Sequence, residues 1–166
     1  MTIAASLLPE FEHEMATTRS LLERVPEQQA AWAPHPKSMT LGRLAAHIAE
    51  LPGWMMSTVQ QPELDFGAPG AYNPTQFTTT AELLKLFDAN VKAAREALAP
   101  VSDADMGVDW TLRNGEQVIF TLPRAAVVRS FVINHIIHHR GQLSVYLRLH
   151  DVPLPSIYGP TADTKG

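Results

Sequence analysis

The chain has 166 residues, a formal net charge of −4 and no cysteine. The length favours a single domain over residues 1–166, and the acidic balance argues against a nucleic-acid partner. Without cysteine, the chain has no disulfide, no thiolate metal site and no thiol nucleophile of its own. No apolar run approaches the roughly 20 residues of a membrane helix, and the N-terminus lacks a basic signal segment. We therefore expect a cytoplasmic protein without a membrane partner.

The first predicted helix runs from about Ile3 to Arg24. Its apolar residues recur every three or four positions, as they do on one face of a helix. The Pro-rich stretch VPEQQAAWAPHPKSM then predicts a loop. A second helix is predicted from Leu41 to about Thr58, with Thr40 as its N-cap. Pro52 lies inside this segment and predicts a kink or a break there.

A long loop is predicted for residues 61–77, which are rich in Gly and Pro. Thr79 and Glu82 then form a Thr-x-x-Glu capping box, which predicts the start of a third helix that ends at Pro100. The dipeptide Asn114-Gly115 between two short β-type runs predicts a two-stranded hairpin.

The fourth predicted helix begins near Thr121-Leu122-Pro123, with Pro in its first turn, and runs to about His150. From about residue 151 we expect an extended tail that frays towards its end. Four amphipathic helices of this length, with a small β-hairpin before the last one, predict an all-α four-helix bundle.

Three histidines could converge in such a bundle. His135 and His139, in the stretch NHIIHHRGQL, are four residues apart and therefore share one helix face. His47 lies on the apolar face of the second helix, where an ordinary core would carry Leu or Ala. Three neutral imidazoles from two helices would make a nitrogen-ligand metal site with room for water or substrate. The alternative left open is that all three are ordinary, hydrogen-bonded core histidines.

Other residues near this face allow two interpretations each. Glu50 either reaches the site as a base or forms a salt bridge, and Trp54 either walls a pocket or packs in the core. The loop of residues 61–77 either lines the mouth of the site or is packed structure; its aromatic residues are Phe66, Tyr72 and Phe77. Helix capping, packing or a subunit interface is expected for Asn134, Arg140 and Gln142. Exposure to solvent is expected for His13, His35, His138 and His150.

Two metalloprotein classes are excluded by spacing. No Glu directly follows His135, so the His-Glu-x-x-His pattern of zincins is absent. Ferritin-like di-iron bundles need Glu-x-x-His pairs, and neither His47 nor His135 has a Glu three residues before it.

The stretches TLGRLAAHIAELPGWM and NHIIHHRGQLSVYLR resemble the two signature stretches of the DinB/YfiT-like family of metal-dependent enzymes. That family has one histidine midway along helix 2 and two in a His-x-x-x-His-Arg-Gly-Gln pattern on the last helix. The matching residues are His47, His135 and His139. The Trp-Ala-Pro loop at Trp32, the hairpin and the length also agree. The resemblance implies a four-helix bundle, a homodimer, and one divalent ion (nickel, zinc or manganese) held by these histidines.

The resemblance also implies thiol chemistry, because the wider superfamily includes bacillithiol S-transferases and a mycothiol-dependent isomerase. An ion held by three histidines keeps open positions and can lower the pKa of a bound water or thiol. The first expectation is therefore an enzyme that activates a low-molecular-weight thiol for transfer to an electrophilic small-molecule substrate. Two alternatives stay open: a metal-dependent hydrolase, and a non-catalytic metal-binding stress or interaction protein.

Overall fold

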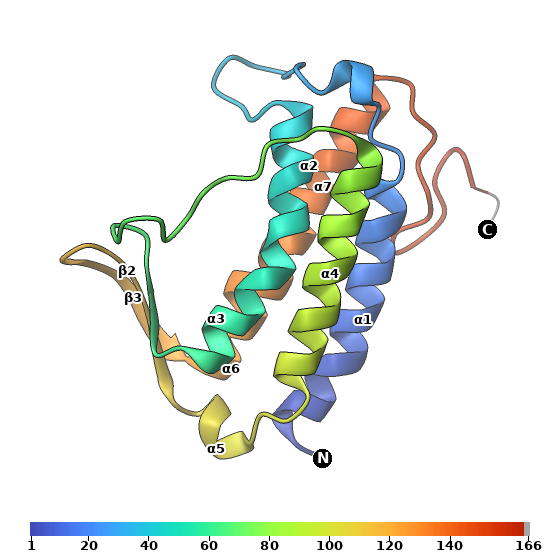
Figure 1. The fold of residues 1–166 in the computed structure, drawn as a ribbon. Helices are drawn as coiled ribbons and strands as arrows, with labels where there is room; N and C mark the ends of the chain where they lie inside the picture. Colours follow the sequence, from blue (N-terminus) through green and yellow to red (C-terminus); the bar gives the residue numbers. More distant parts are fainter. Residues whose placement is uncertain (165–166) are drawn as a thin grey trace.

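The computed structural model describes residues 1–164 of the chain. Four long helical segments lie side by side as a bundle, and a β-hairpin projects beside one end of it (Figure 1). The segments are α1 (Ile3–Leu22), α2 (Leu41–Glu50) continued by α3 (Trp54–Gln60), α4 (Thr80–Leu98) and α7 (Asn134–Leu149). The predicted all-α four-helix bundle, with a small β structure before the last helix, is confirmed.

Hydroxyl side chains begin the first three of these segments. Thr2 caps α1, Thr40 caps α2 and Thr79 caps α4, each accepting a hydrogen bond from a backbone N–H three residues later. Such a cap is typically worth about 1 kcal/mol, because it satisfies a donor that the helix leaves unpaired. The caps predicted at Thr40 and Thr79 are therefore confirmed.

The predicted break at Pro52 is also present. After α2 the chain makes a 3₁₀ turn, Leu51–Gly53, and then begins α3 at Trp54. Proline has no N–H to donate and its ring crowds the preceding turn, so a regular α-helix does not continue through it.

The β structure has one strand more than the sequence indicated. β2 (Asp109–Asn114) and β3 (Gln117–Pro123) pair antiparallel around a turn in which Gly115 has φ 60°. β1 (Glu63–Asp65), inside the segment predicted to be loop, pairs parallel with β2. A strand of three residues carries too little alternation to be recognised. Its partner is remote in sequence, so the pairing is decided by tertiary structure.

The last helical segment begins later than expected. Pro123 ends β3, and α6 (Arg124–Val127) starts directly after it. A π-helical stretch, Val128–Ile133, then leads into α7. The helix start predicted at residues 121–123 was therefore wrong by a few residues, since cross-strand pairing with β2 holds those residues extended. Single π turns are frequent next to functional sites, and this one ends two residues before His135.

The bundle encloses one large apolar core to which every long helix contributes; examples are Phe11, Leu44, Ile48, Phe87 and Leu143. Burying a side chain of this size contributes about 1.5–3 kcal/mol. A smaller cluster of Trp110, Leu112 and Val127 fixes the hairpin to the bundle. Trp110 Nε1 also donates a 3.1 Å hydrogen bond to the carbonyl of Ser57 in α3.

The C-terminal tail is packed rather than frayed, at least as far as residue 164. Val152, Leu154 and Ile157 pack against the main core although the tail contains no helix or strand up to that residue. The Tyr158 hydroxyl donates to Glu14 of α1 and accepts from Arg140 of α7. These contacts attach residues 151–164 to the bundle, whereas the last two residues, at which the expected fraying would be greatest, lie outside the described residues.

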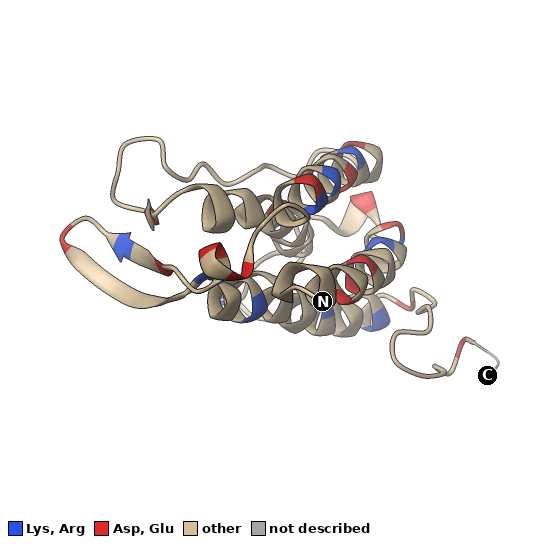
Figure 2. Ribbon diagram, turned by 90° about the horizontal axis from the view of Figure 1, so that it is seen from below, with Lys and Arg blue, Asp and Glu red and all other residues tan. Residues whose placement is uncertain are grey.

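Acidic and basic residues are interspersed along the helices (Figure 2). Arg19 of α1 pairs with Asp88 of α4 at 2.8 Å, and Glu12 of α1 pairs with Arg95 of α4 at 2.8 Å. Exposed pairs of this kind contribute little stability each. None of the helices within residues 1–164 combines the length and apolarity needed to cross a bilayer.

Candidate metal centre

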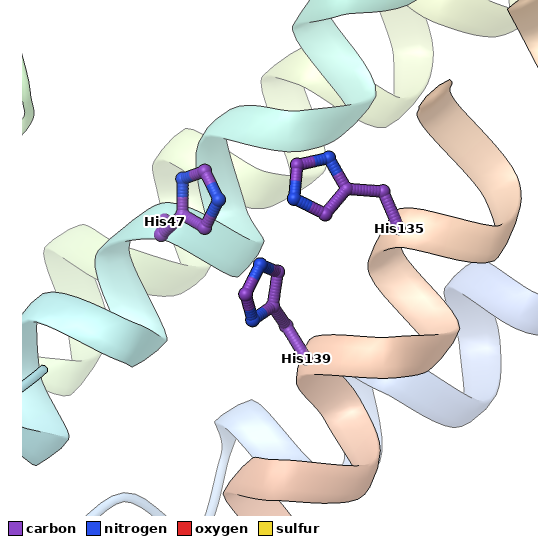
Figure 3. Close-up of side chains that lie close together, drawn as sticks. All are labelled: His47, His135 and His139. Atoms are coloured by element: carbon purple, nitrogen blue, oxygen red, sulfur yellow. The ribbon is translucent and has the colours of Figure 1, made fainter. Parts of the chain in front are cut away.

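The structure brings His47, His135 and His139 together between α2 and α7. One ring nitrogen from each lies within 4.8 Å of the other two, close enough for the three to bind a metal ion. Figure 3 shows these nitrogens turned towards the space between the rings. The ring centroids are 5.2 Å apart for His47 and His135, and 4.7 Å apart for the other two pairs. The convergence arises because α7 places its two histidines one turn apart, opposite the middle of α2.

The other nitrogen of each ring faces a hydrogen-bond acceptor. His139 Nδ1 lies 2.7 Å from Gln142 Oε1, and His135 Nδ1 lies 3.3 Å from the carbonyl oxygen of Phe131. His47 Nδ1 lies 3.5 Å from Glu50 Oε2, too long for a well-formed hydrogen bond, and finds no other partner among the described residues. With Nδ1 facing outward in all three rings, Nε2 is the atom left for a ligand. Metal-binding histidines characteristically have this arrangement.

Burial favours the neutral form of the two histidines on α7. The pKa of His135 is lowered to about 4, first by burial and then by the neighbouring His139 and His47 rings. Burial also lowers the pKa of His139, against the opposing effect of its hydrogen bond to Gln142. Histidine binds a metal in its neutral form, so a site that disfavours protonation is prepared for an ion at ordinary pH. The donor set thus fits a divalent ion of the late first row.

Aromatic rings form one wall of the cluster. Trp54 lies 5.8 Å from the His47 ring and 5.6 Å from the His135 ring, and it stacks on Phe131 at 4.8 Å. Phe66 and Tyr72, from the segment after α3, each lie 6.0 Å from Trp54. Within residues 61–77, Phe66 and Tyr72 thus lie beside Trp54, whereas Phe77 packs against the core.

Glu50 connects this segment to α2. Its carboxylate accepts from the Tyr72 hydroxyl at 2.8 Å and from the backbone N–H of Thr75, and it pairs with Arg43 at 3.3 Å. Burial raises its pKa, but the His47 ring, Thr75 and Tyr72 outweigh burial and lower the pKa to about 2. Such a carboxylate is a weak proton acceptor at neutral pH. Of its two interpretations, the salt bridge is the one that the structure supports.

The remaining histidines lie outside the cluster. His13, His35 and His138 are exposed as expected. His150 is not: it is partly buried, with its ring 4.4 Å from that of Trp32, because the loop before α2 folds over the end of α7. Among the residues flanking the histidine pair, Arg140 is buried in the bundle, whereas Gln142 contacts His139. The sequence signal for that contact is the three-residue spacing on one helix face.

Comparison with known proteins identifies the family. The sequence pattern that defines the DinB superfamily matches residues 10–143. The chain belongs to the DinB superfamily. It is 28% identical over 159 residues to YrdA, an uncharacterised protein of Bacillus subtilis (strain 168), with 94% of this chain and 88% of YrdA covered. The family resemblance stated from the sequence is therefore confirmed, and all three histidines lie inside the matched range.

Solved structures of DinB-like proteins share the fold. A DinB-like protein from Bacillus cereus ATCC 10987 superposes with a TM-score of 0.69 at 24% identity, covering 92% of this chain and 95% of its own. The DinB-like protein YjoA from Bacillus subtilis gives a TM-score of 0.70 at 17% identity, covering 94% and 99% of the two chains. At these identities the likeness shows the arrangement of helices and hairpin and nothing about activity.

Proposed function

We propose that the protein is a metal-dependent enzyme in which His47, His135 and His139 hold one divalent ion. The observation that supports this proposal is the convergence of three imidazoles, two buried and one half-buried, whose Nδ1 atoms all face away from the shared space. His47 and His139 are only 7% and 8% exposed. Nickel, zinc and manganese are the candidate ions.

We infer further that the enzyme activates a small-molecule thiol for transfer to an electrophile. A divalent ion with three neutral ligands supplies the charge that lowers the pKa of a coordinated thiol or water towards neutrality. The sulfur must come from outside, since the chain has no cysteine. Transfer forms a carbon–sulfur bond, the leaving group departs with its electron pair, and the thiol proton passes to solvent.

The surrounding residues suit this chemistry in distinct ways. Trp54 and Phe131 stack on each other beside His135 and make this side of the site apolar, which suits the carbon skeleton of an electrophile. Tyr72, held by Glu50 and Arg43, keeps the segment after α3 against that surface. Glu50 is assigned this tethering role and not proton transfer, because its pKa of about 2 is far below neutral pH.

Elemental analysis of protein purified without a histidine tag tests the metal site. We expect about one equivalent of a divalent ion in the parent, as for a mononuclear site. Both His47→Ala and His139→Ala should lose it, while His13→Ala, which changes an exposed histidine, should retain it. Absence of bound ion in the parent after incubation with nickel, zinc and manganese would contradict the proposal.

An activity screen separates the three candidate functions. The metal-loaded protein is incubated with a panel of thiols and electrophiles, and loss of free thiol is followed. Thiol loss that depends on both the electrophile and His47 supports transfer. Product release without any thiol supports hydrolysis. A protein that binds its ion and turns over neither type of substrate fits the non-catalytic binding alternative.

A further inference from the structure

Among the three polar contacts made by the Nδ1 atoms of the histidines, the one with Gln142 is the shortest. Its Oε1 lies 2.7 Å from His139 Nδ1, against 3.3 Å for the acceptor at His135 and 3.5 Å for that at His47. An amide oxygen only accepts hydrogen bonds, so this contact requires a proton on Nδ1. A neutral imidazole carries a single proton, and Nε2 is therefore left with a free lone pair.

We propose that Gln142 is a positioning residue that holds His139 as the Nδ1–H tautomer and turns its Nε2 towards His47 and His135. Figure 3 shows the two nitrogens of His139 on opposite sides of the ring, one of them facing the other two histidines. Two rotatable bonds orient a histidine side chain. Fixing the far nitrogen removes the alternatives in which Nε2 is protonated or points elsewhere.

Because Gln142 is exposed, its effect on His139 can be tested without disturbing the fold. Gln142 is exposed, three residues after His139 on α7, so its side chain contributes little to the core. Leucine and glutamate have helix propensities close to that of glutamine, so replacement by either leaves the helix intact. The buried neighbours Arg140 and Leu143 stabilise the bundle and offer no such clean substitution.

The three acceptors also differ in kind. Phe131 contributes a backbone carbonyl that no substitution removes, and Glu50 is occupied by Arg43, Tyr72 and Thr75. Gln142 is therefore the acceptor that a side-chain change can test. Removal of such an outer partner typically weakens metal binding 10–100-fold in other proteins. The expected effect of Gln142 on metal affinity rests on the proposed metal site. Its effect on the tautomer of His139 does not.

The first experiment uses the metal-free full chain. Nitrogen-15 NMR of the histidine rings at pH 7.5 distinguishes the two tautomers of His139. We expect Nδ1–H in the parent, a shift towards Nε2–H in Gln142→Leu, and retention of Nδ1–H in Gln142→Glu, whose carboxylate also accepts. Gln28→Leu, the same change at an exposed glutamine in the turn Glu27–Gln29, is the control and should leave His139 unchanged.

The second experiment measures the dissociation constant of zinc for the same four proteins by competition with a chelating dye. We expect Gln142→Leu to bind 10–100-fold more weakly than the parent. Gln142→Glu and Gln28→Leu should bind at least as tightly as the parent.

The outcomes distinguish this inference from the proposed function. An Nε2–H tautomer in the parent, or an Nδ1–H tautomer that persists in Gln142→Leu, overturns the inference. Equal zinc affinity in Gln142→Leu and the parent overturns its affinity part. If Gln142→Leu changes the tautomer but the parent binds no ion, the positioning role stands and the proposed metal function falls.

Discussion

At the scale of single residues, burial decides the chemistry of the candidate site. A histidine in water gains a proton near pH 6.5, whereas burial and two neighbouring rings lower the pKa of His135 to about 4. Between these values the unfolded chain binds more protons at this position than the folded chain does. Stability must therefore rise with pH across that window, and fall as the solution is acidified.

We predict that the metal-free protein loses stability as the pH falls from about 6.5 to about 4. Unfolding by urea in the presence of a chelator, at several pH values in this range, measures the effect. His135→Phe should weaken the pH dependence without removing it, because His139 also has a lowered pKa. His138→Phe, at an exposed neighbour, should keep the parent's dependence. Identical pH profiles for His135→Phe and the parent would show that His135 is not buried in its neutral form.

Glu50 responds in a lower pH range, which overlaps that of His135 only between about pH 4 and pH 4.5. The pKa of its carboxylate is lowered to about 2 in the folded protein, against about 4.5 in the unfolded chain. The ionised carboxylate therefore contributes fully to the stability of the fold above about pH 4.5. That contribution is lost as the pH falls below 4.5. We therefore predict that Glu50→Gln reduces the loss of unfolding free energy of the metal-free protein below about pH 4.5 and leaves the slope above that pH unchanged, which urea unfolding at several pH values measures.

At the scale of elements, the loop after β1 contacts the turn of the β2–β3 hairpin. This contact positions the loop that carries the aromatic residues next to Trp54. Asp65 Oδ1 accepts from the backbone N–H groups of Gly67 at 2.8 Å and Gly115 at 2.7 Å. A Cβ added at Gly67 would lie 2.5 Å from the backbone nitrogen of Gly115. Only glycine at position 67 allows the two backbones to come this close. The contact holds the loop that carries Phe66 and Tyr72 against the hairpin turn.

We predict that Gly67→Ala destabilises the fold by about 1–3 kcal/mol, the usual cost of overpacking. Gly159→Ala is the matched control, since a Cβ there would meet no atom of the described chain within 4 Å. Urea unfolding of both variants measures the difference. The close approach is not a constraint if the two alanine variants unfold at the same urea concentration.

At the scale of the whole molecule, one buried ion pair joins three distant parts of the chain. Arg140 of α7 lies 2.6 Å from Glu14 of α1, with side-chain exposures of 1% and 7%. The Tyr158 hydroxyl of the tail contacts both. Arg140 directly follows His139, so the same contacts that attach the tail also fix the helix that carries two of the histidines.

We predict that Glu14→Ala costs about 3–5 kcal/mol, because it leaves a buried guanidinium without its counter-charge. Glu12→Ala removes the partner of the exposed Arg95 and should cost no more than about 1 kcal/mol. The free energies of unfolding of the two variants provide the comparison. Similar losses for both would mean that the Glu14–Arg140 pair is screened by solvent.

Local sequence determined the helices and the identity of the candidate ligands. The caps at Thr40 and Thr79, the break at Pro52 and the turn at Asn114-Gly115 depend on neighbouring residues, so the chain order alone predicts them. The four-residue spacing of His135 and His139 has the same local origin. His47 was a candidate because it lies on an apolar helix face, and the family resemblance supported its grouping with the pair, which no local rule predicts.

Tertiary structure decided what depends on remote partners. β1 exists because β2 lies beside it, and the strand that continues to Pro123 delays the last helix for the same reason. The packed tail, the half-buried His150 and the contact of Glu50 with Tyr72 each depend on residues that are remote in the chain. Burial sets the pKa of His135, and burial is a property of the assembled bundle. Sequence spacing joined His135 to His139, but only packing brought His47 to the pair, because α2 and α7 lie side by side in the bundle.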